Sequence, residues 1–386
     1  DQRRDAEIDA DGTFEILVLG LRPSRDYDWQ IAGETSDGES LATEVATLTT
    51  GPVPSSFPSL DVSSVDAERA IQGFLVTSLI ADVSVPVVID TSGEYVWWHA
   101  GTEEGVTICR ARLSRDGESV LYLGYARIDL GAEIVDGQTL VRVSLDGTDE
   151  QVTTTTGGGR DFYEMADGTI AMLTFDIRPM DDHDLNGDVI VEIAPDGSTT
   201  EVFNIWDHLD EIPEVASGPG LCHANHLEYD EERGVYHMSC RGLAAILVID
   251  RASGDILSQI GGQYSDYETP DGSTELFRDQ HGFQVLDDGV LVFDNEGPPE
   301  MNSNVRQYRL WDETGVAEEV WHYQTDPPVF VYVLGDASKL PNGDNLVTWT
   351  TAGQIEQVTE AQDVVWRLNS GFGAGFGYTT FREDLY

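Results

Sequence analysis

Short apolar segments separated by tight-turn residues dominate the chain from about residue 70 to its end. In a typical unit, the strand expected at 109–113 leads to Asp116 and Gly117, and an apolar segment follows at 120–123. Asp-Gly and Asn-Gly turns between apolar runs are typical of antiparallel strand pairs. Helical periodicity is nearly absent, and only residues 205–215 are compatible with a short helix. The pattern predicts an all-β chain.

The strand and turn pattern recurs loosely, at intervals of roughly 40–60 residues. Six units can be followed by their turns, which fall at 92–93, 116–117, 167–168, 233–234, 288–289 and 342–343. Four-stranded units that close radially form a β-propeller, in which repetition protects the strand edges. We therefore predict a six-bladed β-propeller over residues 70–386. An arrangement of two β-sandwiches fits the spacing less well.

Residues 1–51 follow a different pattern, with short strands expected at 14–19, 27–31 and 42–50. The run LGLRPSRDYDWQIAGETSDGES, followed by TLTTG, resembles the second half of a fibronectin type III module, in which Tyr27 would form the tyrosine corner. We expect a partial fibronectin type III-like β segment at 1–51, a small and incomplete β-sandwich. A Pro/Ser-rich linker is expected at 52–69.

The charge is strongly one-sided, with 71 Asp and Glu against 21 Lys and Arg and a net charge of -50. Such a surface repels nucleic acids and anionic membranes, whose binding depends on Lys and Arg. It suits a high-salt, halophilic setting, where screening weakens the self-repulsion. No apolar run approaches the roughly 20 residues of a membrane helix, so membrane insertion is not expected. We expect a secreted, periplasmic or cell-surface protein whose export signal has been removed.

Two of the three cysteines flank an apparent hairpin whose turn is at 230–234. In that register Cys222 and Cys240 lie directly opposite each other, with Cβ atoms about 4.5–5.5 Å apart. A cross-strand disulfide and two reduced buried cysteines are both compatible with this placement. Cys109 is expected to be a single buried thiol.

Polar residues open the inner strands of three predicted blades, at positions that otherwise call for packing. The motifs are Arg160-Asp161-Phe162, His223-Ala224-Asn225 and His281-Gly282-Phe283. Leaving such groups buried and unpaired costs about 1–3 kcal/mol each, so they need a role. Equivalent positions of different blades converge at the mouth of a propeller channel. They form either a binding site or the lining of a hydrated channel.

The hairpin of the fourth blade adds a further cation to this set. In the inferred register, Arg241 lies on the same face as His223 and Asn225. A guanidinium beside two imidazoles and an amide can bind a tetrahedral oxyanion, because it offers a permanent charge and a planar donor pair. The spacing therefore favours a site for a sulfate or phosphate group.

The same residues resemble those of a known family. LCHANHLEYDEERGVYHMSCRGLAAILVIDRASGDILSQIGG and DQHGFQVLDDGVLVFDNEG are similar to the central part of the arylsulfotransferases, and the similarity covers about residues 55–386. The resemblance implies transfer of a sulfuryl group from an aryl sulfate to a phenol, with no nucleotide sulfate donor and no cofactor. It implies that His281 becomes transiently sulfurylated. Arg241, His223 and Asn225 would stabilise the sulfate oxygens, and His223 would also protonate the departing phenoxide.

One position departs from the family pattern. Alignment on residues 165–168 places Gly159 and Arg160 where the family has a histidine pair. Arg160 keeps a cation for the sulfate but cannot shuttle a proton near neutral pH. We expect Arg160 to bind substrate and the transferase activity to be retained. An activity altered in its substrate or pH dependence, or lost with the binding pocket kept, is the other outcome of this replacement. The alternative is a non-catalytic, surface-displayed binding or assembly module with a vestigial sulfate pocket. Hydrolysis, with water as acceptor, also remains open.

A second constellation suggests a metal. Asp182, Asp184, Asn186 and Asp188 place oxygen atoms at alternate positions around Gly187, which resembles a calcium loop. In so acidic a chain such spacing arises easily by chance, so we favour a solvated acidic loop over a metal site. Asp294, Asn295 and Glu296 either help to position the site or form a turn. The expected partners are small molecules, an aryl sulfate and a phenol, and the sequence does not indicate an oligomeric state.

Overall fold

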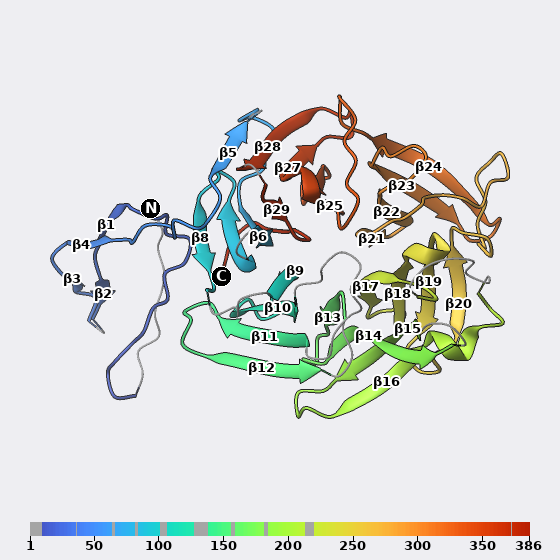
Figure 1. Cartoon of the computed structure of the whole chain (residues 1–386). Coiled ribbons are helices and arrows are strands. Elements are labelled where there is room, and N and C mark those ends of the chain that lie inside the picture. Colours follow the sequence, from blue (N-terminus) through green and yellow to red (C-terminus); the bar gives the residue numbers. More distant parts are fainter. Residues whose placement is uncertain are drawn as a thin grey trace.

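Six β-sheets are arranged radially around one axis, which confirms the six-bladed β-propeller (Figure 1). The structure is a computed structural model that describes residues 10–35, 37–63, 66–81, 84–100, 106–126, 138–155, 159–180, 184–212, 220–371 and 373–386. In these ranges the only helical elements are three short 3-10 helices, η1 (Ile205–His208), η2 (Arg241–Leu243) and η3 (Thr350–Ala352). None of the helical elements described is long and apolar enough to cross a membrane.

Blades two to five are each built from four consecutive antiparallel strands. Blade two contains β9 (Val106–Leu113), β10 (Ser119–Ala126), β11 (Gln138–Ser144) and β12 (Glu150–Thr155). Blade three contains β13 (Phe162–Glu164), β14 (Ile170–Pro179), β15 (Asp184–Ile193) and β16 (Thr199–Asn204). Blade four contains β17 (Ala224–Asp230), β18 (Val235–Cys240), β19 (Ala245–Asp250) and β20 (Ile256–Ile260). Blade five contains β21 (Phe283–Leu286), β22 (Gly289–Asp294), β23 (Asn304–Trp311) and β24 (Val316–Tyr323).

The first and sixth blades combine segments from both ends of the chain. Blade six contains β25 (Asp336–Lys339), β26 (Asn345–Trp349), β27 (Gln354–Val358) and β28 (Val364–Ser370), and β5 (Leu60–Ser63) pairs with β28. Blade one contains β6 (Phe74–Ile80), β7 (Ser84–Asp90) and β8 (Tyr95–Trp98), while β29 (Gly375–Phe376) and β30 (Thr380–Arg382) both pair with β6. The C-terminal segment thus joins the N-terminal blade and closes the ring (Figure 1).

Two sequence expectations are corrected by this closure. The turn at 92–93 was expected to follow the first strand of a blade, but it follows β7, and both β6 and the C-terminal strands paired with β6 lie further inward. Residues 60–63, expected in the linker, form an outer strand of blade six. Both differences have one cause, since the pairing partners lie roughly 300 residues away in the sequence and no local pattern specifies them.

The N-terminal segment lies outside the ring as two small two-stranded sheets (Figure 1). β1 (Asp26–Trp29) pairs with β4 (Ala46–Thr49), and β2 (Ala32–Glu34) pairs with β3 (Ser40–Ala42). Residues 14–19, expected as a strand, are not in one. The Arg22 N–H donates to the Tyr27 hydroxyl at 2.7 Å, which has the form of the expected tyrosine corner. The fibronectin-like origin of the segment stays a prediction.

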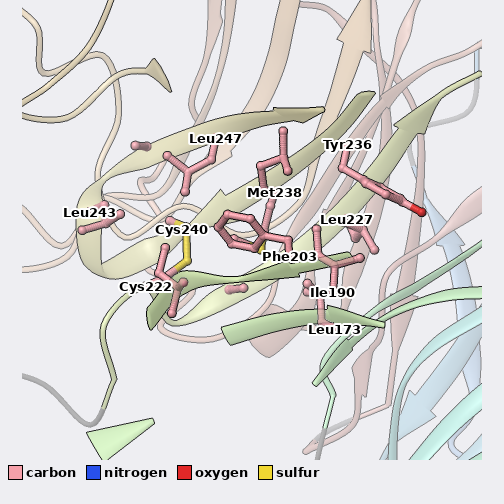
Figure 2. Packing of buried hydrophobic residues seen from close by; sticks show 14 of the residues in the cluster. Leu173, Ile190, Phe203, Cys222, Leu227, Tyr236, Met238, Cys240, Leu243 and Leu247 are labelled. Atoms are coloured by element: carbon pink, nitrogen blue, oxygen red, sulfur yellow. A yellow bond between two sulfur atoms is a disulfide. The ribbon is translucent and has the colours of Figure 1, made fainter. Parts of the chain in front are cut away.

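Apolar clusters between neighbouring blades make up the core, and Figure 2 shows the one between blades three and four. Its labelled members include Leu173, Ile190, Phe203, Leu227, Tyr236, Met238 and Leu247. Cys222 and Cys240 form a disulfide within this cluster, so the oxidised alternative is the correct one. We had expected the two cysteines to be direct register partners, but Cys240 pairs with Ala224. Cys109 is a buried free thiol, as predicted.

Candidate active site

Charged and aromatic side chains fill the axis of the propeller. Every blade contributes one residue from its inner strand or the segment beside it, and the six are Tyr378, Arg110, Asp161, His226, Gly282 and Asp336. Arg110 donates to both carboxylate oxygens of Asp161, at 2.7 and 3.0 Å, and its guanidinium lies 3.9 Å from the centre of the Tyr378 ring. A Cβ atom at Gly282 would lie 2.2 Å from Asp336 Oδ1, so only glycine leaves room for this carboxylate. We call these six residues the axial plug.

The plug is dry and electrostatically compensated. Arg110 and Asp161 are 2% and 0% exposed. Burial raises the pKa of Asp161, but the charges of Arg110 and Arg112 more than offset this and bring the pKa down to about 2. Asp161 also accepts the N–H groups of Phe162 and Leu227. At Asp161, therefore, the hydrated-channel alternative is wrong, and the polar residue is explained by a buried ion pair.

The residues expected to carry chemistry lie where the inner strands of three blades begin. Arg160 precedes β13, His223 precedes β17 and His281 precedes β21. In a propeller these starting points share one mouth of the channel. Arg241 begins η2 directly after β18, and its N–H donates to the His223 carbonyl at 3.2 Å. The disulfide joins the residues that immediately precede His223 and Arg241, so it ties the two segments together.

The turn that carries His223 is held from both sides. The Arg160 Nη1 atom donates to the Ala224 carbonyl at 3.1 Å, and Asp188 Oδ1 accepts the Ala224 N–H at 2.9 Å. His223 itself has a φ of 56°, in the left-handed region that costs energy for any residue with a Cβ. Arg160 and Asp188 therefore fix an unusual backbone conformation from which the imidazole projects. This link between blades three and four was not visible in the sequence.

Asn225 faces the neighbouring blade. Its side chain is 1% exposed, and Nδ2 donates to the Gln280 carbonyl at 3.1 Å. Gln280 in turn donates to the carbonyls of Cys240 and Ala245, both at 3.0 Å. One of the two N–H donors of Asn225 therefore holds the peptide before His281, rather than pointing to a substrate as we had expected.

His281 is 4% exposed and hydrogen-bonded through one ring nitrogen. Its Nδ1 atom lies 2.9 Å from Asn295 Oδ1 and 3.2 Å from the carbonyl oxygen of Asp279. The Nε2 atom makes no hydrogen bond to the residues that the structure describes. Asp279 also contacts the Arg241 Nη2 atom through its carboxylate, at 2.8 Å. The segment before β21 thus organises both the imidazole and the nearest arginine.

Both imidazoles are uncharged at neutral pH. Burial lowers the pKa of His281 to about 3, and the positive charges of Arg241 and Arg160 add to the effect despite the hydrogen bond from Asn295. Burial likewise lowers the pKa of His223 to about 2, together with Arg160, Arg241 and His281. The mutual influence of these four groups places them in one electrostatic environment. A positive site in a protein of net charge -50 is suited to an anion.

Three of the four candidate calcium ligands lie in a strand rather than in a loop. Asp182 lies outside the described residues, while Asp184, Asn186 and Asp188 belong to the strand β15. Gly187 pairs with Asp176 within that sheet, and a Cβ there would lie 2.1 Å from Trp206 Nε1, so packing explains the glycine. Asp188 is buried and binds backbone N–H. Across the described ranges, no group of three His, Cys, Asp or Glu residues could hold a metal ion.

The structure is a six-bladed β-propeller whose channel mouth holds two arginines and two histidines of lowered pKa in one electrostatic environment. The chain belongs to the arylsulfotransferase (ASST) family, which matches residues 62–370. A search of the curated proteins finds no match.

Among solved structures, a protein of unknown function from Bacteroides caccae is 14% identical, with a TM-score of 0.51 over 80% of this chain and 98% of its own. The periplasmic gluconolactonase of Pseudomonas aeruginosa is 12% identical, with a TM-score of 0.47 over 81% and 99%. An inactive variant of virginiamycin B lyase from Staphylococcus aureus is 13% identical, with a TM-score of 0.44 over 79% and 87%. The likeness to the Bacteroides caccae protein concerns the fold alone.

Sequence reasoning missed the residues that support the site. Asp279 was not singled out, Asp188 was assigned to a metal, and Asn295 was left between two roles. A signal for Asn295 existed in the hairpin of blade five, where Phe283 pairs with Val292. Continuing that register by two residues places His281 opposite Asp294, the last residue of β22, which directly precedes Asn295. The residue partners could therefore have been derived from the turn at 287–288.

Proposed function

We propose that the protein transfers a sulfuryl group from an aryl sulfate to a phenolic acceptor through a sulfurylated His281. The observation that carries this proposal is the state of His281, a neutral imidazole held through Nδ1 beside two arginines. Neutral imidazole is a competent nucleophile, and covalent catalysis divides one difficult step into two. Membership of the arylsulfotransferase family supports the same reaction class.

In the first half-reaction, the Nε2 lone pair of His281 attacks the sulfur atom. The bond between sulfur and the aryl oxygen breaks, and its electron pair leaves with the phenoxide. In the second half-reaction, the oxygen of the acceptor phenol attacks the same sulfur and loses its proton, while the electron pair of the N–S bond returns to Nε2. Donor and acceptor supply all the atoms, so no nucleotide, metal or further cofactor enters the balance.

Arg241 and Arg160 would stabilise negative charge on the sulfate oxygens, as cationic groups do in phosphoryl transfer. Because the pKa of His223 is lowered to about 2, this residue is neutral in the empty site. We had expected His223 to act as an acid. A neutral imidazole is better suited to donate a hydrogen bond to the sulfate and to accept the proton of the phenol. Arg160 would then replace the family histidine as a fixed cation, with no part in proton transfer.

We propose an exported location, in the periplasm or outside the cell. The Cys222–Cys240 disulfide supports it, because such bonds persist in oxidising compartments. The acidic composition supports a high-salt setting, in which screening allows an anionic substrate to approach.

The test is release of p-nitrophenol from p-nitrophenyl sulfate, with and without phenol, in high-salt buffer. We expect turnover that depends on phenol and falls at least about 1,000-fold in His281→Ala, since the nucleophile is lost. His99→Ala serves as the matched control, because His99 lies on the outer side of blade one and contacts Tyr122. In the absence of an acceptor, ³⁵S-labelled donor should leave label on wild type and none on His281→Ala.

Two other outcomes have definite meanings. Turnover that is independent of phenol and yields inorganic sulfate would identify a hydrolase. No turnover by folded wild type over a broad range of pH and acceptors would contradict the proposal and favour the binding module. Arg160→His would then test whether the missing family histidine is the cause.

A further inference from the structure

We propose that Asn295 is the positioning residue that sets the tautomer of His281 and so leaves Nε2 free to react. The inference deepens the proposed function and rests on it for its catalytic meaning. Its structural part, the location of the proton on Nδ1, stands on hydrogen-bond geometry alone.

The orientation of the Asn295 amide is determined by its surroundings. The side chain is 1% exposed, and Nδ2 lies 2.7 Å from the carbonyl oxygen of Val331 and 2.8 Å from that of Leu334. Two carbonyl oxygens can be bonded only by the NH2 group, because the amide oxygen has no hydrogen to donate. The opposite orientation would bring three oxygens together in a buried site. Asn295 therefore presents Oδ1, an acceptor, to His281.

The proton of His281 follows from this orientation. The two atoms closest to Nδ1 are both acceptors, Asn295 Oδ1 at 2.9 Å and the Asp279 carbonyl oxygen at 3.2 Å. Nδ1 must carry a hydrogen to bond either of them. In a neutral imidazole the other nitrogen is then an unprotonated acceptor, so Nε2 keeps its lone pair. With the opposite tautomer, Nδ1 would face two oxygens without a proton and Nε2 could not attack.

Asn295 is itself firmly held. The Ser303 hydroxyl donates to the Asn295 carbonyl at 3.0 Å and accepts the Val331 N–H at 2.8 Å. The preceding residue, Asp294, accepts the N–H groups of Arg278 and Glu296, both at 3.0 Å. The Asp294 carboxylate therefore binds the backbone both in the segment before His281 and in the segment after Asn295. Three segments that are distant in sequence, 278–281, 294–303 and 331–334, meet to hold one ring.

Three variants separate orientation from structure. Asn295→Leu keeps the approximate size of the side chain but removes the acceptor, and we expect kcat to fall 10–100-fold, as for other residues that orient a reactive imidazole. Asn295→Asp keeps the acceptor toward Nδ1 but replaces the NH2 group, which donates to two carbonyls, by an oxygen. This variant should keep the Nδ1–H tautomer while it lowers the free energy of unfolding, and the acidic limb of the pH profile should move to higher pH because of the added charge. Asn345→Leu is the control, because Asn345 is equally buried but bonds only within blade six. It should change neither kcat nor the profile.

The decisive readout does not require activity. Nitrogen-15 NMR of the imidazoles in wild type, with the His281 signals assigned by their absence in His281→Ala, reports which nitrogen carries the proton. We expect Nδ1–H and an unprotonated Nε2 in wild type and in Asn345→Leu, and a mixture of tautomers in Asn295→Leu. If Asn295→Leu does not fold, the wild type still provides the test, because an Nε2–H signal there would contradict the assignment.

The outcomes for this inference and for the proposed function are distinct. An Nε2–H signal in wild type that still transfers sulfuryl groups overturns the role of Asn295 and leaves the function intact. An Nδ1–H signal in a protein that transfers nothing contradicts the function and leaves the tautomer assignment standing. Equal loss of kcat in Asn295→Leu and Asn345→Leu, with an unchanged tautomer, would reduce Asn295 to a structural residue.

Discussion

Arginine, histidine and aspartate meet twice in this propeller, once in the axial plug and once at the mouth where the inner strands begin. In the plug, Arg110 places two nitrogens on Asp161 and its planar face on Tyr378. At the mouth, Arg241 makes one contact with Asp279, and its Nε atom has no partner among the described residues. The same residue types are used in both places, but the arginine side chain is more fully paired in the plug than at the mouth, although His226 Nε2 in the plug also has no hydrogen-bond partner among the described residues.

The electrostatic consequences differ in the same way. In the plug, arginine charges stabilise an anion of the protein and lower the pKa of Asp161 to about 2. At the mouth, arginine charges act on two imidazoles and lower the pKa values of His281 and His223 to about 3 and about 2. The mouth thus holds a positive potential that an oxyanion can satisfy. A cluster of charged residues is therefore informative about function only when its internal pairing is known.

The largest expected effect is on the plug. Asp161→Ala should reduce the free energy of unfolding by about 3–5 kcal/mol, because Arg110 would remain buried without its carboxylate. Chemical denaturation in high-salt buffer measures this, with the exposed Asp61→Ala as control. A loss below about 1 kcal/mol would mean that water or another carboxylate compensates, and the comparison between plug and mouth would fail.

The next effect concerns the mouth, and it should appear in activity. Arg241→Ala is expected to lower kcat by about 100- to 1,000-fold, as removal of one charge-stabilising donor does elsewhere, while the free energy of unfolding changes by about 1 kcal/mol or less. Arg241→Lys should restore only part of the rate, because an ammonium lacks the planar pair of donors. A stability loss as large as that of Asp161→Ala would make Arg241 a structural residue.

The smallest effect separates the two regions by pH. The histidines bind protons in the unfolded chain below about pH 6.5 but not in the folded protein, so stability should fall as the pH drops from 6.5 toward 3. Each group contributes about 1.4 kcal/mol per pH unit in that window. The pKa of Asp161 is lowered from 3.8 to about 2 in the folded protein, so the stability that Asp161 contributes is lost only as the pH falls through this range.

His281→Gln should therefore flatten the pH dependence of unfolding between pH 6 and 4, whereas Asp161→Ala should leave that slope unchanged. Asp294, whose pKa burial raises to about 6, acts in the opposite direction, so the difference between variants is the quantity to compare. An identical slope in His281→Gln and wild type would show that His281 is not held neutral.

Local sequence was sufficient for much of the fold. The turns at 116–117, 167–168 and 342–343 lie between paired strands of one blade, as predicted, and the turn expected at 288–289 lies one residue earlier, at 287–288. Polar residues at inner-strand starts identified Arg160, His223 and His281, and the cysteine pair was located within one hairpin. The exact register there was wrong, because a β-bulge between Ala224 and His226 shifts the pairing. Such a bulge has no reliable signal in one sequence.

Alternation of apolar and polar residues, turn chemistry and charge determined the all-β class, the number of blades and the residues gathered at the mouth, since each acts between near neighbours. Tertiary structure alone decided how the ring closes, since β6 pairs with strands at the other end of the chain. It also decided that Asp161 is neutralised by Arg110, that Asp188 binds backbone, and that Asn295 fixes the proton of His281. The contacts of Asp161 and Asp188 join different blades, and the orientation of the Asn295 amide depends on carbonyl groups at residues 331 and 334, so no spacing along the chain encodes them.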